Sequence, residues 1–362
     1  MKKQSFFFVH LFNDYSGSPL VLKNMINAIK KSGESITLLT SKHSGFLSNI
    51  SETSYIRLFY KYSNIKLITF FFFTLSQIDV FLKLSVNILI HRFKKNKCTV
   101  VINTILPFSA GLAAFLFANR TIYYIHETHI KPKLLNKLLL FGVRKFSDEI
   151  IYVSNYTKDA IDIQKNCIVI PNPLRNDFNL NPSLDFHAKH NDKNVFFSGS
   201  LKAYKGIYNF IKIAEHCPQI NFIAALNCHE TDFHEFVTKY HHQNISFFHR
   251  PNFIKSLYEK SFIILNLSIP EDWTETFGLS ILEGMSYGCV PIVPPAGGPL
   301  EIVNPDFGYY IHSNHVDKIS KIINDLSCNY NEWYKKSQSA LNKSNEFSFQ
   351  EYTKSINNFL GI

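Results

Sequence analysis

Residues 262–293 read FIILNLSIPEDWTETFGLSILEGMSYGCVPIV, and this stretch indicates the architecture of the chain. Two apolar runs, FIILNL (262–267) and CVPIV (289–293), enclose a segment with helical spacing near 278–287. Continuous apolar runs of this length are typical of strands buried on both faces, and a helix between two of them is typical of a parallel sheet. The stretch therefore predicts a strand–helix–strand unit of an α/β domain.

The same alternation continues in both halves of the chain. The first half has strand-like runs at 6–10, 36–40, 99–104, 121–126, 149–154 and 167–171, and helical patterns near 19–31, 63–95, 108–118, 131–145 and 155–164. The second half has strand-like runs at 194–199, 220–226, 244–249, 262–267, 289–293 and 308–312, and helical patterns near 205–216, 254–260, 278–287, 298–304 and 315–327. Two such series predict two doubly wound, Rossmann-like domains that face a cleft, with ligands beyond the carboxyl ends of the strands.

The expected boundary between the domains falls in a segment without sustained periodicity. Residues 171–194 are rich in Asn, Pro, Asp and His, which is typical of an interdomain linker. We expect a first domain over 1–175, a second over 176–340, and a helical tail over 341–362 that could cross back to the first domain.

Composition narrows the function classes. The net charge is +10, from 38 Lys and Arg against 28 Asp and Glu, and it would suit an anionic lipid surface or a phosphorylated small molecule. Nucleic acid ranks last as a partner because no zinc-finger or RNA-recognition signature occurs. The six cysteines are scattered without a C-x-x-C pair, which favours free thiols in a reducing cytoplasm. We expect no signal peptide, since only FFFV follows Met1-Lys2-Lys3.

One strongly apolar segment raises the question of a membrane. Residues 67–90 are interrupted by Asp79 and Lys83, and a charge in the middle of a spanning helix is costly. We expect one or two amphipathic helices lying against a core or against a membrane surface. Basic residues flank the segment and favour an anionic leaflet, namely Lys66, Arg92, Lys94, Lys95 and Lys97. A buried domain helix fits the stretch equally well.

Candidate ligand-binding residues in the first half follow two strands. Gly17 lies at the turn between the first strand and its helix, where a bare helix start can bind an anion, although a plain turn explains it nearly as well. His126 follows the run at 121–126, a position suited to a ligand contact or to a structural histidine. Glu127 and His129 lie beside it, but a metal site would need a third convergent ligand.

The second half offers positive charge and carboxylates at comparable positions. Lys202 and Lys205 precede a helix, where a positive charge is unfavourable because of the helix macrodipole. We therefore expect an anionic ligand, most simply a phosphate, to bind there. Glu275 and Glu283 stand eight positions apart and could accept hydrogen bonds from two sets of hydroxyl groups. A sugar nucleotide has two sets of hydroxyl groups with a diphosphate between them, so these residues together are suited to bind one. The alternatives are solvated lysines, a helix cap at Glu275 and a solvated helix face at Glu283.

Several motifs together resemble the retaining glycosyltransferases of family four, which have a two-Rossmann B-type fold. ETFGLSILE (275–283) resembles the E-x7-E motif of that family, and the likeness extends over IPEDWTETFGLSILEGMSYGCVPIVPPAGGPLEIV (269–303). SGSLKAYKGI, VSNYT (153–157) and VIPNPL (169–174) resemble further elements of the family. The likeness is strong over 150–312 and absent over 44–95.

The resemblance implies roles for individual residues. Glu283 would bind the nucleotide ribose, Glu275 and His126 the donor sugar, and Lys205 the leaving diphosphate. Residues that would line the phosphate or the approach to it are Gly17, Gly199, Lys202 and the backbone amides of Phe277, Gly278 and Leu279. Two positions depart from the family: Ser200 replaces its arginine, for which Lys202 could substitute, and Asn172-Pro173 replaces its Asn-Gly.

The implied activity is retaining transfer of a hexose or an N-acetylhexosamine from a UDP- or GDP-sugar to a lipid-linked saccharide. Such an enzyme would serve O-antigen or lipopolysaccharide synthesis as a cytoplasmic protein, peripheral at the inner face of an anionic plasma membrane. No cofactor is expected, and the absence of D-x-D from the sequence argues against a metal held by paired aspartates. The alternatives are a transferase with a soluble small acceptor and a non-catalytic sugar-nucleotide-binding subunit.

Overall fold

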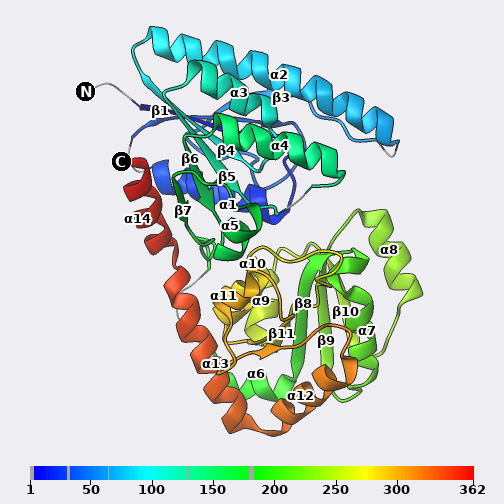
Figure 1. The fold of residues 1–362 in the computed structure, drawn as a ribbon. Coiled ribbons are helices and arrows are strands. Elements are labelled where there is room, and N and C mark those ends of the chain that lie inside the picture. Colours follow the sequence, from blue (N-terminus) through cyan, green and yellow to red (C-terminus); the bar gives the residue numbers. More distant parts are fainter. Residues whose placement is uncertain (1–3, 31–32, 64, 129, 179–182) are drawn as a thin grey trace. The chain divides into compact units, whose positions relative to one another are not determined.

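A computed structural model describes residues 4–30, 33–63, 65–128, 130–178 and 183–362. The chain divides into two compact units. The first contains the residues up to Pro173 together with Gln350–Ile362, and the second contains Leu174–Phe349 (Figure 1). Part of the expected linker, 179–182, lies outside the described residues.

The first unit is built on a seven-stranded sheet of order β3-β2-β1-β4-β5-β6-β7, in which all pairs are parallel. Its strands are β1 (Gln4–His10), β2 (Ser35–Ser41), β3 (Ser54–Leu58), β4 (Lys97–Asn103), β5 (Arg120–Ile125), β6 (Glu149–Tyr152) and β7 (Cys167–Val169). Its helices are α1 (Gly17–Ile29), α2 (Lys66–Phe93), α3 (Phe108–Phe117), α4 (Lys133–Phe146), α5 (Asn155–Ile161) and α14 (Phe349–Leu360). The strand order reverses between β1 and β4, and α2 makes the long crossover from β3 back to β4.

The second unit has a six-stranded parallel sheet of order β10-β9-β8-β11-β12-β13, which reverses between β8 and β11. Its strands are β8 (Asn194–Ser200), β9 (Asn221–Asn227), β10 (Ile245–His249), β11 (Ser261–Leu265), β12 (Val290–Val293) and β13 (Tyr309–Tyr310). Its helices are α6 (Phe186–Asp192), α7 (Ile207–Glu215), α8 (Glu230–Lys239), α9 (Ile254–Lys260), α10 (Leu279–Met285), α11 (Pro299–Ile302), α12 (Val316–Cys328) and α13 (Tyr330–Ser344), with short 3₁₀ turns η2 (Ala203–Lys205) and η3 (Asn345–Phe347).

The prediction of two doubly wound parallel-sheet domains is confirmed. The pattern missed β3, α8 and most of α13. Few of the side chains of β3 and α8 are buried, so these two elements give a weak apolar signal, and α13 buries few large apolar side chains. Residues 186–192, which we assigned to the linker, form α6. The segment around 67–90 is a single helix, α2, and among the described residues Leu67–Phe93 is the one helix with the length and composition to cross a membrane.

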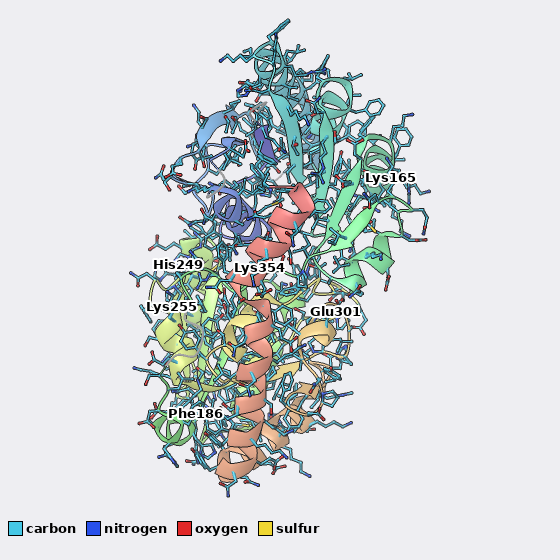
Figure 2. All side chains as sticks on the ribbon, turned by 90° about the vertical axis from the view of Figure 1, so that its left-hand side faces the viewer. Lys165, Phe186, His249, Lys255, Glu301 and Lys354 are labelled. Atoms are coloured by element: carbon cyan, nitrogen blue, oxygen red, sulfur yellow. The ribbon has the colours of Figure 1, made fainter. Side chains whose placement is uncertain are left out.

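Arg120 is one of the residues that join the last helix to the rest of the first unit; Tyr124, whose hydroxyl lies 3.3 Å from that of Tyr352, is another. The Arg120 guanidinium donates to the backbone carbonyls of Phe359 and Leu360 at 2.9 and 3.2 Å, and also pairs with Glu149. These carbonyls end α14 and have no partner within the helix, so a cation there satisfies them and complements the helix dipole. The helix is visible in Figure 2, where it carries Lys354.

We predict that Arg120→Ala loosens α14 selectively. Losing the hydrogen bonds of a charged donor destabilises a structure by roughly 1–3 kcal/mol. Amide hydrogen exchange should therefore quicken over 350–361, while the neighbouring α13, which belongs to the second unit, keeps its protection. Unchanged exchange in α14 would contradict this role for Arg120.

Candidate functional site

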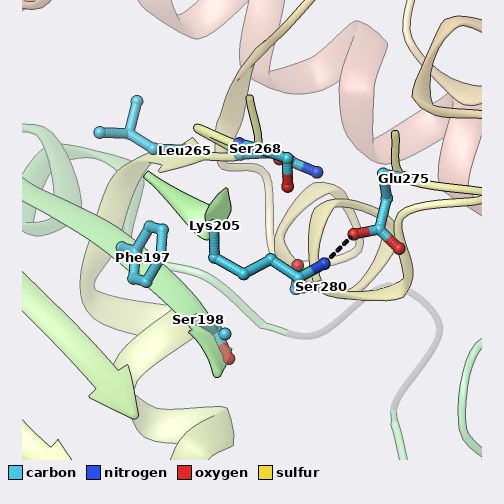
Figure 3. A pocket seen from close by; sticks show the side chains of 9 residues that line it. Phe197, Ser198, Lys205, Leu265, Ser268, Glu275 and Ser280 are labelled. Atoms are coloured by element: carbon cyan, nitrogen blue, oxygen red, sulfur yellow. Dashed lines mark hydrogen bonds and ion pairs between the residues drawn. The ribbon is translucent and has the colours of Figure 1, made fainter. Parts of the chain in front are cut away.

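A pocket of the second unit lies where its strand order reverses. It is lined by the ends of β8 and β11 and by the segments that follow them: Phe197, Ser198, Gly199, Lys205, Leu265, Asn266, Ser268, Glu275 and Ser280 (Figure 3). Carboxyl ends of parallel strands at such a reversal are the usual ligand-binding position of doubly wound sheets. The pocket is thus where sequence and topology both lead us to expect chemistry.

Lys205 and Glu275 form an ion pair inside this pocket. The Lys205 ammonium extends toward the Glu275 carboxylate and lies 2.6 Å from its Oε2 (Figure 3). Lys205 ends the turn η2, and Gly206 follows it with φ of 81°. A Cβ at Gly206 would lie 2.0 Å from the backbone oxygen of Leu267, so only glycine fits there and the lysine is held against the loop after β11.

The backbone of Glu275 is held from the other side by two glycines. The Gly298 amide donates to the Glu275 carbonyl at 2.9 Å. A Cβ at Gly297, whose φ is 82°, would come within 2.3 Å of the same carbonyl oxygen. This close approach fixes the loop that presents Glu275. It also explains why the motif has two glycines here, since a Cβ at either position would clash with the backbone of this loop.

The other predicted residues of the second unit are distributed around this pair. Gly199 lines the pocket, and Phe277, Gly278 and Leu279 form the entry to α10. Gly278 precedes the helix in the left-handed conformation, and helix geometry leaves the first amides of α10 without intrahelical partners. Lys202 is exposed and is not among the residues that line the pocket.

Glu283 is buried and engaged by two residues. Arg175 Nε lies 3.1 Å from Glu283 Oε1, and the Tyr258 hydroxyl donates to Oε2 at 2.8 Å. Burial raises the pKa of Glu283, while the Arg175 charge and the Tyr258 hydrogen bond oppose this. Arg175 also stacks on the ring of Phe178, with its Cζ 4.2 Å from the centroid.

The contacts of Glu283 decide whether its carboxylate can still accept hydrogen bonds from a ribose, as predicted. An ionised carboxylate offers about four lone-pair sites, and two contacts leave acceptor capacity. Glu283 is not among the pocket-lining residues, so its contact with a ribose stays a prediction. Arg175 was missed because it lies in the segment that we assigned to the linker, and no spacing rule connects it to Glu283.

A second cluster lies at the corresponding reversal of the first sheet, between β1 and β4. His10 ends β1, Asn103 ends β4, and His126 follows β5. The Asn103 side chain lies between the two imidazoles, 2.9 Å from His10 Nδ1 and 2.8 Å from His126 Nε2. The structure thus brings His126 together with two residues that we had not considered as site residues.

The hydrogen bonds of Asn103 fix the tautomers of both histidines. Its Nδ2 lies 3.2 Å from the Ser18 carbonyl, which can only accept, so this atom is the amide nitrogen. Nδ2 therefore donates to His10 Nδ1, and Oδ1 accepts from His126 Nε2. His126 consequently carries its proton on Nε2 and keeps Nδ1 as an acceptor for a hydroxyl donor.

Both imidazoles are neutral at physiological pH. Burial lowers the pKa of His10 to about 4, and burial together with the His10 charge lowers that of His126 to about 3. Burial raises the pKa of Glu127 to about 7, opposed by hydrogen bonds from nearby backbone amides and from the Thr104 hydroxyl. Thr104 has φ of 74°, an unusual conformation for a β-branched residue, and marks a strained turn beside this cluster.

Gly17 begins α1 and is exposed, and His129 lies outside the described residues. Within the described part of the chain, no group of three or more His, Cys, Asp or Glu side chains could hold a metal ion.

We predict that His10 makes the stability of the protein depend on pH. Its folded pKa of about 4 is below its unfolded value, so its contribution is complete above about pH 6.5 and is lost as the pH falls toward 4. The contribution is about 3 kcal/mol by linkage. Urea titrations at pH 7 and 4.5 should show a smaller pH effect in His10→Asn than in the wild type, and an unchanged effect in the control His234→Gln. An equal pH effect in His10→Asn would contradict the prediction.

We predict that Arg175→Met destabilises the second unit by roughly 3 kcal/mol at pH 7, because it leaves a buried carboxylate without its cation. Lower pH should relieve the loss, since protonation removes the uncompensated charge of Glu283. Denaturant unfolding should show that Arg175→Met/Glu283→Gln is more stable than Arg175→Met alone, with Lys255→Met as the control for an exposed pair. A double variant no more stable than Arg175→Met would count against the pairing.

Comparison with known proteins agrees with this geometry. Residues 184–345 match the model of the family described as "Glycosyl transferases group 1". No curated protein matches the sequence significantly. Three solved structures illustrate the likeness of fold. Anabaena Alr3699/HepE in complex with UDP and glucose has a TM-score of 0.80 and 17% identity over 99% of both chains.

Sucrose-phosphate synthase from Thermosynechococcus elongatus has a TM-score of 0.80 and 13% identity, over 99% of this chain and 98% of that one. A glycosyltransferase from Rickettsia africae has a TM-score of 0.74 and 16% identity over 99% of both chains. At these identities the likeness concerns the fold. Residues 184–345 are thus similar to a glycosyl transferases group 1 domain, and the whole chain shares the two-domain fold of these solved structures.

Proposed function

We propose that this protein is a retaining glycosyltransferase. It moves a hexose or an N-acetylhexosamine from a nucleoside-diphosphate sugar to a lipid-linked glycan during synthesis of a bacterial surface polysaccharide such as O-antigen or lipopolysaccharide. The observation that carries the proposal is the Lys205–Glu275 ion pair, held in a pocket at the strand reversal of the domain that matches the group 1 family model.

In this proposal Lys205 stabilises the charge that develops on the leaving diphosphate. A fixed ammonium group in a partly buried pocket needs no reorganisation during reaction, which is the usual source of electrostatic catalysis. The amides of Phe277, Gly278 and Leu279 contribute further donors at the start of α10. Gly199 lets the backbone approach the phosphates. In our proposal Gly17 and Lys202 line the path by which the phosphates of the donor enter the site.

The carboxylates and the histidine bind hydroxyl groups. Glu275 accepts from the donor sugar while it also orients Lys205, and His126 accepts through its unprotonated Nδ1. Glu283 accepts from the ribose. The bond between the anomeric carbon and the diphosphate breaks, and the acceptor oxygen bonds to the same face of the sugar. The acceptor proton passes to the leaving phosphate. We expect no metal to be needed, because lysine and backbone amides supply the positive potential.

The donor proposed first is a UDP-sugar, because solved structures of Alr3699/HepE that share this fold contain UDP or UDP-glucose. The acceptor is less constrained. A soluble sugar phosphate is the second candidate, since sucrose-phosphate synthase has an equally similar fold. A lipid-linked acceptor would locate the protein at the inner face of the plasma membrane.

We predict that Lys205→Met lowers kcat by about 100-fold or more, as expected for the loss of one stabilising group in the transition state. Turnover of UDP-sugars should be measured with pooled lipid-linked and phosphorylated acceptors, and the anomeric configuration of the product should be read by NMR. Lys212→Met, on the exposed side of α7, is the matched control. Thermal stabilisation by UDP but not by NAD should accompany turnover.

Two results would overturn the proposal. An inverted anomeric product would exclude the retaining mechanism. UDP binding by a folded wild type without turnover on any acceptor would favour a non-catalytic sugar-nucleotide-binding subunit.

A further inference from the structure

The crossover helix α2 exposes an apolar face along its whole length. Its inner face, including Val80, Leu84 and Ile88, belongs to the core of the first unit. The exposed large apolar side chains recur at helical spacing from one end to the other: Leu67, Ile68, Phe70, Phe71, Ile78, Leu82, Val86, Leu89, Ile90 and Phe93. The terminal ones, Leu67 and Phe93, are 81% and 84% exposed. An ordinary surface helix has polar residues on this side, and so large a patch indicates an interaction site.

The two charges within this stretch are withdrawn from that outer face. Lys83 lies 2.8 Å from Asp79 Oδ1 and donates to the Arg57 carbonyl at 2.7 Å. Asp79 Oδ2 accepts from the Phe59 amide at 2.8 Å. Both side chains are therefore occupied at the end of β3. The charges that seemed from the sequence to interrupt an apolar segment instead fasten the helix to its own domain.

The apolar surface continues over the two neighbouring helices. In Figure 1, α2, α3 and α4 lie side by side on one face of the first sheet, and α3 packs against both of the others. Phe115 and Leu116 are exposed at the end of α3. The outer side of α4 alternates exposed apolar and basic side chains: Lys133, Leu134, Lys137, Leu138, Phe141, Arg144 and Lys145. We call the outward side of these three helices the docking face.

The positive charge of the chain is concentrated in the same region. Residues 66–147, which include all three helices, contain twelve Lys and Arg and two acidic residues, Asp79 and Glu127, an excess that equals the net charge of +10 of the whole chain. Glu127 lies after β5, outside the three helices, and is hydrogen-bonded to the backbone there. Beside the apolar end of α2 stand the exposed basic residues Arg92, Lys94, Lys95 and Lys97.

We propose that the docking face binds an anionic bilayer, with α2, α3 and α4 lying in the plane of the membrane surface. The apolar side chains enter the interfacial layer, and the basic ones contact lipid phosphates. The helix α2 does not span the membrane in this arrangement, because its inner face and the Asp79–Lys83 pair remain packed on the first unit. A second copy of the chain fits the face poorly, since its basic side chains would meet one another.

The binding itself does not depend on transfer activity. Only the biological role of this binding, which is to bring the enzyme to a lipid-linked acceptor, rests on the proposed function. Membrane binding and sugar transfer can therefore fail independently, and the test measures them separately.

The test is co-sedimentation of the full-length protein with vesicles of phosphatidylcholine, alone or with one third phosphatidylglycerol. We expect binding to the anionic vesicles, weakened by salt, and little binding to phosphatidylcholine alone. Lys133→Gln/Lys137→Gln/Lys145→Gln should weaken binding roughly 100-fold, since each removes one basic contact near the surface. The charge-matched control, Lys318→Gln/Lys321→Gln/Lys335→Gln on α12 and α13, should bind as the wild type does.

A second pair of variants tests the apolar contribution. Leu82→Gln/Phe93→Gln should weaken binding at least tenfold, whereas Phe253→Gln/Leu300→Gln, which changes exposed apolar residues of the second unit, should not. Stabilisation by UDP should be the same in all of these variants, which separates this test from that of the donor site.

Three outcomes would overturn the proposal. The first is no binding to anionic vesicles. The second is binding that both docking-face variants leave unchanged. The third is a wild-type dimer that Leu82→Gln/Phe93→Gln dissociates, which would assign the face to a second copy of the chain.

Discussion

In a parallel sheet that helices cover on both faces, side chains can meet a ligand only beyond the carboxyl ends of the strands. This constraint governs both units. Each sheet reverses its strand order once, between β1 and β4 in the first and between β8 and β11 in the second. Polar side chains, which would be costly to bury between the sheet and its helices, lie at these two reversals. His10 and Asn103 stand at one of them, and the Lys205–Glu275 pair lies beside the other.

The two clusters handle charge in opposite ways. In the first unit a single amide side chain connects two imidazoles whose burial keeps them neutral, so the cluster can orient hydroxyl groups without attracting a charged ligand. In the second unit the groups are a lysine and a glutamate in contact, and a diphosphate would compete with Glu275 for the lysine.

Much of this could be predicted from the sequence, and the reasons for the rest are physical. Alternating apolar runs predicted both sheets, and the glycines around Glu275 and Lys205 marked turns that glycine alone can form. Asn103 could not be found, because it is one polar residue at the end of an apolar run and its importance depends on which strands become neighbours. Arg175 stands 108 positions before Glu283 in the sequence, so only the fold brings them into contact. The charges of α2 indicated an amphipathic helix, but the sequence does not say which side of the helix faces the protein.

The contact between Arg120 and the last turn of α14 has a consequence for biosynthesis. The first unit consists of residues from both ends of the chain. A nascent polypeptide that has emerged as far as β7 still lacks the helix that completes this unit, and the whole second unit must be translated before that helix appears. The second unit is contiguous in sequence and can fold as soon as it emerges from the ribosome. The first unit, in contrast, stays incomplete until α14 has been synthesised. Premature termination would therefore be most harmful to the part of the protein that is made first.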